Sequence, residues 1–405
     1  MSSFDVMAFR RHFPFFSQQP DWIYLDSAAT MHKPQAVIDA ETEFYQRFNS
    51  NVHRGAHQLS RIATQQFEAA RDTIAEYLNA SARHEVVFTS GATAALNQIA
   101  FGLMHTLVKP GDRILLTQLE HHANIVPWQI HCQHQGVHLD IVPLTDSLQL
   151  DLAAFKQLLE LKPKVVSISQ VSNVLGHIQP LDDMIALAKA AGAITVIDGA
   201  QGIVYQRPDM QQLDCDFYVF SGHKLYGPTG TGVLYGKSRY LEQLRPMLGG
   251  GEMIEQVSFV NTTFASLPFR LEAGTPNIGG AIALAAAVTW LLQFNNNAIK
   301  QHKALLLNSF YDGLTRFKNV DILSSAVHNA GIVAFNVADE HPSDVADLLN
   351  QQHIAVRAGQ HCAMPLFNSL SKAGAVRCAF AAYNTMDDVN QCLLALEQAV
   401  EILTA

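Results

Sequence analysis

Between residues 81 and 236, the chain alternates short apolar runs with longer segments in which apolar residues recur at helical spacing. Several short runs are apolar throughout, as expected of strands that helices cover on both faces. The predicted strands are Glu85–Thr89, Arg113–Thr117, Val165–Ser169, Ile194–Asp198, Phe217–Ser221 and Gly232–Tyr235. Helical patterns such as Ala94–Thr106 and Leu181–Ala191 lie between them. The alternation predicts an α/β fold with a mostly parallel central sheet and helices on both faces.

The pattern changes near Asn295, where a long helical pattern is followed by shorter segments of mixed type. These segments are Gly331–Val337, Ser343–Gln352, Ile354–Ala358, Val376–Ala382 and Met386–Thr404. They predict a smaller α+β C-terminal domain, since 405 residues exceed what one hydrophobic core usually serves. We expect a large domain over residues 22–294 and a small domain over residues 1–21 and 295–405. The run Asn277–Gly280 is the expected hinge.

Composition excludes several classes of protein. A net charge of −9 argues against a partner such as nucleic acid or an anionic membrane, because both need a basic face. The N-terminus does not resemble a secretion signal, and the longest near-apolar run, Ala281–Phe294, is too short to span a bilayer. The five cysteines lack metal-ligand or CxxC spacing, so no metal site is expected. We expect a cytoplasmic, reduced protein with free thiols.

Two charged residues follow neighbouring predicted strands, where ligands of open parallel sheets bind. Asp198 ends one strand, and an acid there is able to pair with a protonated pyridine nitrogen. An isolated Asp-Gly after a strand is nevertheless more often a helix N-cap. Lys224 comes one strand later, after a very apolar run, and a partly desolvated lysine is a competent amine for imine formation. The pair predicts pyridoxal 5′-phosphate (PLP), held as a Schiff base on Lys224.

Polar residues near other strand ends suit the rest of such a cofactor. The run Ser90–Ala95 opens a helix with small residues, so its free backbone N–H groups form a general anion site. Ser221 and His223 are able to donate to a phosphate, and Gln201 to hydrogen-bond the phenolic oxygen. No Walker sequence is present, which weakens a nucleotide interpretation.

Adjacent histidines, His121 and His122, follow the strand Arg113–Thr117. A histidine here is able to stack on a cofactor ring and handle protons. A metal site is the alternative, but neighbours in sequence seldom ligate one ion, and no HExxH spacing supports it. The pattern therefore favours the cofactor over the metal.

One cysteine differs from the others in its context. Free cysteines are by default small buried hydrophobic residues. Four of them lie in helix-like or strand-like segments: Cys132, Cys215, Cys378 and Cys392. Cys362 instead lies in a loop after a strand ending at Ala358, beside His361, where a thiol ionises more easily and reaches a substrate. On the residues alone, the structural and reactive interpretations of Cys362 are equally good.

Taken together, the motifs resemble those of the cysteine desulfurases, which belong to the class V aminotransferase-like, fold-type I PLP enzymes. The matching segments are Leu25–Thr30, Glu120–Asn124, Val171–Asn173, Asp198–Gln201 and Ser221–Lys224. They occur in the family's order and cover almost the whole chain. The run Arg357–Ala363 resembles the group II (Suf-type) branch, and most closely its cysteine sulfinate desulfinase subgroup. Many group II members have histidine where this chain has Gln360, which leaves the preferred substrate open.

The resemblance implies roles for matching residues. Lys224 holds PLP, Asp198 pairs with its ring nitrogen, and Gln201 bonds its phenolic oxygen, while His121 stacks on the ring. The residues implied to bind the phosphate are Thr93, Ser221 and His223, with Thr275 reaching the partner's site in a homodimer. The residues implied to hold the substrate are Asn173 and Arg377, and Arg377 is implied to bind the carboxylate of the substrate. His53 and Arg54 are expected near the mouth of the site.

The resemblance also implies a reaction. The Cys362 thiolate attacks the sulfur of L-cysteine, L-alanine leaves after protonation by His121, and the resulting persulfide passes to a small SufE-like acceptor protein. Selenocysteine follows the same path, and cysteine sulfinate needs no attacking thiol. The alternatives are another class V enzyme, such as an aminotransferase or a kynureninase-like hydrolase, and a PLP-binding or sulfur-relay scaffold without turnover.

Overall fold

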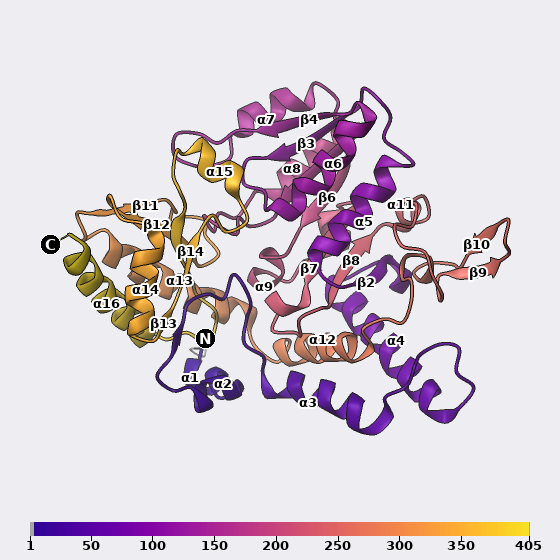
Figure 1. The fold of residues 1–405 in the computed structure, drawn as a ribbon, viewed down its shortest axis with the longest axis horizontal. Helices are drawn as coiled ribbons and strands as arrows, with labels where there is room; N and C mark the ends of the chain where they lie inside the picture. The colour runs from indigo at the N-terminus through magenta and orange to yellow at the C-terminus, as the bar shows by residue number, and fades with distance from the viewer. Residues whose placement is uncertain (1–3, 405) are drawn as a thin grey trace.

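The computed structural model describes residues 4–404 and is organised around two main β-sheets (Figure 1). Within these residues, the larger sheet has seven strands in the order β2-β8-β7-β6-β5-β3-β4. They are β2 (Val86–Thr89), β3 (Arg113–Thr117), β4 (His138–Val142), β5 (Val165–Ser169), β6 (Ile194–Asp198), β7 (Phe217–Ser221) and β8 (Gly232–Gly236). The strands from β7 to β4 pair in parallel, whereas β8 is antiparallel to β7 and β2. The predicted fold class is confirmed.

Helices cover both faces of this sheet, which explains why its central strands are apolar throughout. On β3, Ile114 and Leu116 point to one face and Leu115 to the other. The first face packs against α5 (Ala92–Met104) and α6 (Val126–Gln135). The second face packs against α4 (Gln58–Leu78), α7 (Leu152–Leu159), α8 (Leu181–Ala190) and α12 (Ile278–Leu291). Further elements are α3 (Gln35–Glu43), α9 (Gly202–Tyr205), α10 (Met210–Leu213), α11 (Ser238–Leu241) and the hairpin β9 (Ile254–Val257) with β10 (Thr262–Phe264).

Strand β4 was absent from the sequence prediction. It lies at the edge of the sheet, where it pairs only with β3. Of its residues only Val142 is buried, and His138 and Asp140 interrupt its apolar positions. An edge strand with so little burial carries no continuous apolar run, so hydrophobic patterning does not detect it.

Within the described part of the chain, the smaller sheet has four antiparallel strands in the order β11-β12-β15-β14. They are β11 (Val320–Ile322), β12 (Ile332–Val337), β15 (Ala375–Ala379) and β14 (Arg357–Gly359). The helices α13 (Asn296–Leu314), α14 (Pro342–Gln351) and α16 (Met386–Thr404) pack against it. The expected strand Ile354–Ala358 is divided, because β13 (Ile354–Ala355) pairs instead with β1 (Ile23–Tyr24). The proposed domain limits stay predictions, and residues 1–3 and 405 lie outside the described part.

The run Asn277–Gly280, the expected hinge, lies at the start of a helix. Asn277 caps α12 by accepting the Gly280 N–H, and Ile278–Gly280 form the first helical turn. The chain changes direction after this helix, where α12 and α13 meet at 85°. By length and composition, no single helix within residues 4–404 is able to cross a membrane; only the bent pair α12 and α13 passes that test jointly.

The N-terminal segment joins the two sheets through an aromatic cluster. Helices α1 (Val6–Arg10) and α2 (Pro14–Gln18) lie beside the smaller sheet in Figure 1. Arg10 ion-pairs with Asp388 of α16 at 3.0 Å. Phe9, only 1% exposed, contacts the rings of Trp290 and Phe294 at the end of α12. The segment therefore packs on α16, as expected, and also against aromatic rings at and just beyond the end of α12.

Replacing Phe9 with Ala should lower the free energy of unfolding by about 3–5 kcal/mol, because a fully buried ring leaves a cavity that the surrounding rings fill only in part. Urea denaturation followed by fluorescence measures this change. Met7→Ala on the same helix is the control, since Met7 is 54% exposed. Equal effects of the two changes would contradict the role of Phe9 in the cluster.

Candidate active site

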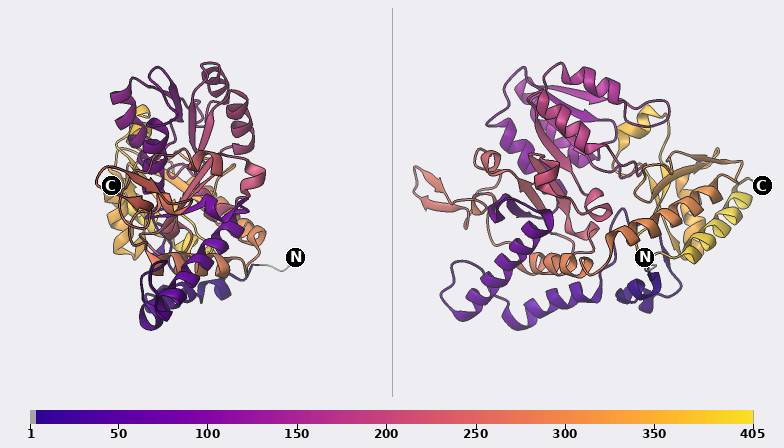
Figure 2. Two further views of the ribbon diagram at one scale, coloured as in Figure 1. Left: turned by 90° about the vertical axis from the view of Figure 1, so that its right-hand side faces the viewer. Right: turned by 180° about the vertical axis from the view of Figure 1, so that it is seen from behind.

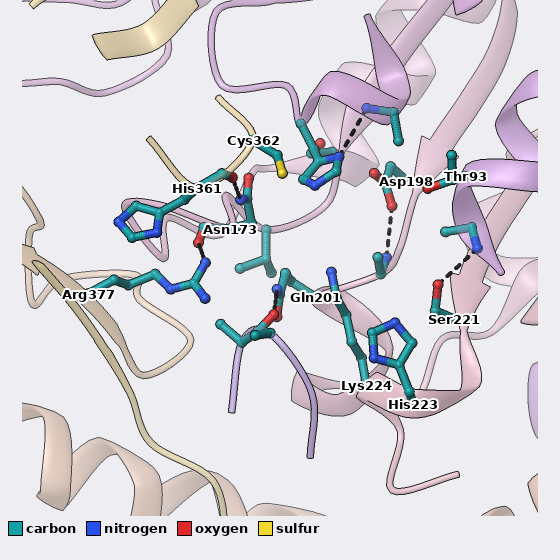
Figure 3. A pocket seen from close by; sticks show the side chains of 18 of the residues that line it. Thr93, Asn173, Asp198, Gln201, Ser221, His223, Lys224, His361, Cys362 and Arg377 are labelled. Carbon is teal, nitrogen blue, oxygen red and sulfur yellow. Dashed lines mark hydrogen bonds between the residues drawn. The ribbon is translucent and has the colours of Figure 1, made fainter. Parts of the chain in front are cut away.

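A cavity of about 270 Å³ lies at the carboxyl edge of the larger sheet (Figure 3). The predicted site residues that line it are Thr93, His121, Asn173, Asp198, Gln201, Ser221, His223, Lys224, Cys362 and Arg377. Thr275 does not line it and lies exposed in the loop before α12. His53 and Arg54 also lie outside the lining, where both ion-pair with Glu252. The structure therefore brings together residues from the strand ends and from the smaller sheet.

Lys224 and Asp198 are the two charged residues at the base of the cavity. Lys224 lies in a 3-10 turn, Gly222–Lys224, that directly follows β7, and its amine extends toward the centre of the pocket (Figure 3). Burial lowers the pKa of Lys224, and the Asp198 carboxylate opposes that shift. Asp198 ends β6 and accepts the Ala200 N–H at 3.0 Å. Burial raises the pKa of Asp198, so this carboxylate favours a neighbour that carries a proton or a positive charge.

One end of the cavity is built to hold an anion. Thr93 lies in the first turn of α5, whose N-terminal N–H groups face the pocket. The Ala92 N–H donates to Ser221 Oγ at 2.9 Å, which leaves the Ser221 hydroxyl proton for a ligand. Gly91 precedes the helix with φ +149°, a conformation that favours glycine. His223 completes this end, and burial together with Lys224 lowers its pKa to about 4.

A buried carboxylate, Glu120, fixes the loop that carries His121. Its oxygens accept hydrogen bonds from Thr117 at 2.6 Å, Asn124 at 2.7 Å and both the N–H and the hydroxyl of Ser169. These bonds join the ends of β3 and β5 beneath the pocket. The motif Glu120–Asn124 marked this residue in the sequence, but its positioning role was not predicted.

The tautomer of His121 follows from one hydrogen bond. Its Nδ1 accepts the Ala123 N–H at 3.0 Å, so the neutral ring carries its proton on Nε2. Burial lowers the pKa of His121 to about 4, and the nearby Lys224 adds to this effect. At neutral pH, His121 therefore presents a hydrogen-bond donor to the pocket.

His122 has a different task, which sequence reasoning missed. Its backbone N–H donates to the Cys362 carbonyl at 2.7 Å, and its Nε2 accepts the Met364 N–H at 2.9 Å. Asn173 adds a third tether, because its side-chain amide donates to the His361 carbonyl at 2.7 Å. These three bonds hold the loop between β14 and α15 (Met364–Ser369) over the larger sheet.

Within residues 4–404, no cluster of side chains suits a metal ion.

Among the described residues, Cys362 is the only exposed cysteine; the other four are buried, as predicted. His361 and Cys362 both have left-handed backbones, with φ of 49° and 57°. For non-glycine residues this costs about 1–2 kcal/mol each, and such strain is typical of functional loops. The His361 ring points away, with Nε2 bonded to the Ala375 carbonyl. The sequence suggested that this histidine acts on the thiol, but the charged neighbours of Cys362 are Arg357, Arg377 and Lys224.

Arg377, buried in β15, is held at the edge of the cavity by two acceptors. It donates to the Asn173 carbonyl at 2.8 Å and to Asp26 at 3.0 Å. Asp26 also accepts a hydrogen bond from Arg357 at 3.0 Å. Asp26 lies in the matched motif Leu25–Thr30 and Arg357 in the run Arg357–Ala363, but neither was predicted to act in the site.

The pocket fits PLP by the chemistry of its donors. A buried carboxylate, Asp198, suits a protonated ring nitrogen, and a helix N-terminus with two side-chain donors suits a phosphate. Gln201 donates one amide N–H to the Ala28 carbonyl at 2.7 Å and keeps the other for a ligand. Among the described residues, the Lys224 amine has no ion-pair partner, as required of a group that forms a covalent bond with a cofactor.

This fold and this pocket define a fold-type I PLP-dependent enzyme. The model of the family "Aminotransferase class-V" matches residues 23–392, and the chain belongs to this family. A "Probable cysteine desulfurase" of Vibrio cholerae is 45% identical over 98% of both chains, and a "Cysteine desulfurase" of Serratia proteamaculans is 43% identical over 99% of this chain and all of its own. The crystal structure of the cysteine desulfurase CsdA from Escherichia coli superposes with a TM-score of 0.92 at 40% identity, covering 99% of this chain and all of that one. The family predicted from the motifs is confirmed.

Replacing Glu120 with Gln should change how stability depends on pH. Burial raises the pKa of Glu120 to about 7 from an ordinary 4.5. An acid whose pKa is raised by folding stabilises the protein fully below pH 4.5, its ordinary pKa. About 3 kcal/mol of this stabilisation is lost as the pH rises through 7. The wild type should therefore lose that much more free energy of unfolding than E120Q between these pH values, as urea denaturation measures. Glu76→Gln, at an exposed position of α4, is the control, and parallel curves for wild type and E120Q would refute the shift.

Proposed function

We propose that this chain is a PLP-dependent cysteine desulfurase that converts L-cysteine to L-alanine and takes the sulfur onto Cys362. One observation supports this above the others: the exposed Cys362 thiol and the Lys224 amine line the same cavity. Full-length relatives at 43–45% identity are named cysteine desulfurases. Other chemistries of the family do not need a thiol at this place.

The cofactor is held by groups that the pocket already orients. Lys224 would bind it covalently, Asp198 would keep a proton on its ring nitrogen, and Gln201 would donate to its phenolic oxygen. Thr93, Ser221 and His223 would bind its phosphate at the N-terminus of α5. His121 would stack on the ring, with its Nε2 proton directed into the pocket. When bound, PLP supplies an electron sink for a carbanion at the substrate's α-carbon.

The substrate is oriented by the opposite side of the pocket. Arg377 takes the carboxylate, and Asp26 and the Asn173 carbonyl keep its guanidinium in place. Asn173, predicted to bind substrate, has its amide engaged by the His361 carbonyl, so we infer that it acts by positioning both Arg377 and the thiol loop. The Lys224 amine, with its lowered pKa, is then free to remove the proton from the α-carbon.

Sulfur transfer follows at Cys362. Its thiolate attacks the substrate sulfur, so an S–S bond forms and the C–S bond breaks. The electron pair of the broken bond goes to the three-carbon fragment, which takes up protons and leaves as L-alanine. His121 donates one of these protons from the pocket side. Arg357 and Arg377 line the cavity together with the attacking sulfur.

The second candidate function is that of another PLP enzyme of the class V family. An aminotransferase or a kynureninase-like hydrolase uses the same cofactor groups but does not need Cys362, and a scaffold without turnover would be inert to cysteine. The tethers of the Cys362 loop favour the desulfurase, because they fix the thiol over the cavity.

Replacing Cys362 with Ala should abolish alanine formation from cysteine while the cofactor absorbance stays, because the thiol attacks sulfur but does not hold PLP. Alanine release by the purified holoenzyme, measured with a reducing thiol present, checks this. Cys132→Ala is the matched control, since that thiol is buried in α6. Full activity of C362A with cysteine would exclude the persulfide step, and a keto acid product would favour the aminotransferase.

Replacing Lys224 with Ala should remove the visible absorbance of covalently bound cofactor, because no other described amine lines the cavity. Spectra of the purified protein before and after addition of PLP measure this. Lys372→Ala is the control, because Lys372 pairs with Asp321 and does not line the cavity. An unchanged spectrum of K224A would refute the cofactor assignment.

A homodimer and a small SufE-like sulfur acceptor complete the proposal. Thr275 is exposed and outside its own cavity, which suits a residue that reaches a partner's phosphate. The hairpin β9–β10 projects from the body near this loop (Figure 2). Its tip carries Phe259 and Val260, which are almost fully exposed apolar residues suited to burial in a second copy. The free thiols suit the reducing cytoplasm.

The subgroup also belongs to the proposal. The run Arg357–Ala363 supports the Suf-type branch and its cysteine sulfinate desulfinase subgroup, with selenocysteine as a further substrate. Rates of C362A and wild type on the three substrates separate these activities, because sulfite leaves cysteine sulfinate without an attacking thiol. C362A should keep activity with cysteine sulfinate and lose it with cysteine.

Mixed dimers test the role of Thr275. Thr275→Ala should weaken retention of PLP, measured by dialysis of the holoenzyme. In a mixed dimer of T275A with K224A, the site that keeps Lys224 receives Thr275 from its partner and should retain PLP like the wild type. A defect that persists in the mixed dimer would place Thr275 in its own site, and a monomer in sedimentation would refute the assembly.

A further inference from the structure

Arg71 of α4 is fully buried, and each of its guanidinium N–H groups has an acceptor. Two of the five N–H groups form a bidentate pair with Glu272, at 2.6 and 3.0 Å. Two more bond the carboxylate of Glu68 at 3.1 and 3.2 Å, and the last donates to the Val86 carbonyl at 2.9 Å. A lysine has only three donors on a single nitrogen, so this position is built for a guanidinium.

The pair of Arg71 and Glu272 takes the place of a neighbouring strand at the free edge of β2. Among the described strands, β2 pairs only with β8, so its outer backbone groups need partners from elsewhere. The Val86 carbonyl accepts an Arg71 N–H, and the Phe88 N–H donates to Glu272 Oε1 at 2.6 Å. The ion pair therefore fixes the position of the end of β2.

The end of β2 leads directly into the phosphate end of the cofactor pocket. The strand stops at Thr89, and Gly91 then opens α5, whose first turn carries Thr93. A shift of β2 would therefore move the helix N–H groups and the Thr93 hydroxyl that are proposed to bind the phosphate. Arg71 and Glu272 do not line the cavity, so they act on it only through the elements that they hold.

The same carboxylate anchors the loop that carries Thr275. Glu272 begins this loop, and the carbonyl of Leu271 beside it accepts the Gln98 amide of α5 at 3.0 Å. Further along, the Gly274 N–H donates at 3.0 Å to a backbone carbonyl at the base of the hairpin β9–β10. Thr275 follows at once and is exposed. The direction in which Thr275 leaves the body of the chain thus depends on how Glu272 is held.

We propose that Arg71 and Glu272 are positioning residues for the cofactor phosphate in both sites of the dimer. In their own chain they set the end of β2 and hence the start of α5. In the partner's site they act through the loop that presents Thr275. This inference rests on the proposed cofactor and homodimer. One buried ion pair then orients two phosphate contacts that belong to different sites.

Glu272→Gln tests this role with little damage to the fold. The glutamine oxygen is still able to accept the Phe88 N–H, and Glu68 still balances the charge of Arg71. Dialysis of the holoenzyme against a series of PLP concentrations should show about tenfold weaker retention in E272Q, the loss expected when one hydrogen bond to a charged group is misplaced. Retention equal to that of the wild type would overturn the proposal.

Asp388→Asn is the matched control for a purely structural effect. It breaks another buried ion pair, with Arg10, and neither residue lines the cofactor cavity. D388N should lower the melting midpoint and yet retain PLP like the wild type. If D388N and E272Q lose PLP equally at an equal loss of stability, the pair of Arg71 and Glu272 is merely structural and the proposal fails.

Mixed dimers separate the two routes to the phosphate. A chain with K224A has no amine for the cofactor, so each mixed dimer reports on the one site that keeps Lys224. E272Q in the chain that keeps Lys224 tests the route through α5, whereas E272Q in the K224A chain tests the route through Thr275. Retention of PLP should weaken in both arrangements. Wild-type retention in either one would overturn the role in two sites.

The Leu271 carbonyl allows a milder test if E272Q does not fold. Gln98→Met removes only the bond from α5 to this carbonyl and leaves the ion pair intact. Placed in the K224A chain of a mixed dimer, Q98M should weaken retention of PLP at the opposite site. Unchanged retention there would contradict the route through Thr275.

Failure of this inference is distinct from failure of the proposed function. Retention of PLP is measured without cysteine, so it does not depend on sulfur transfer. A wild type that binds no PLP or sediments as a monomer would overturn the proposed cofactor or dimer and this inference together. A wild type that behaves as proposed, with variants that retain PLP equally well, would overturn this inference alone.

Discussion

The three hydrogen bonds that tie the backbone at residues 361–364 to His122 and Asn173 are the contacts on which the rest of the site depends. The cofactor groups stand on the larger sheet, whereas the thiol arrives on a loop from the smaller one. Without these bonds the thiol loop would lose its direct tethers to His122 and Asn173. The tethers also explain why Cys362 keeps a left-handed backbone, because they supply the bonding that offsets its strain.

The polar groups of the pocket form two sets, one for the cofactor and one for the substrate. On one side, Asp198 and the start of α5 create places for a protonated nitrogen and a phosphate. On the other, Arg357 and Arg377 create a place for a carboxylate. His121 and Lys224 lie between these sets, and burial lowers the pKa of both. The groups proposed to move protons therefore lie between the groups that hold the cofactor and those that hold the substrate.

Much of this arrangement could be predicted from the sequence, for reasons that individual residues make clear. Buried parallel strands such as Val165–Ser169 are apolar throughout, so their limits and the residues that follow them are visible. The edge strand β4 is half polar, and β13 and β14 are short strands that pair with different partners, so neither has a distinct pattern. Asp26 and Arg357 were missed because their ion pair joins distant parts of the chain. The tethering role of His122 was hidden for the same reason: its partners in the Cys362 loop come from the other sheet. The family motifs identified which side chains gather, but not which of them hold the others in place.

The pairing of Asp26 with both guanidinium groups has a consequence for selectivity. Two arginines and one carboxylate leave a single net positive charge on this side of the pocket. One substrate carboxylate neutralises it, and a neutral side chain adds nothing further. A second anionic group, such as the sulfinate of cysteine sulfinate, has no further counter-charge among these three residues. The pocket therefore selects substrates by charge as well as by shape. Asp26 sets the net charge on this side of the pocket, although it does not line the cavity.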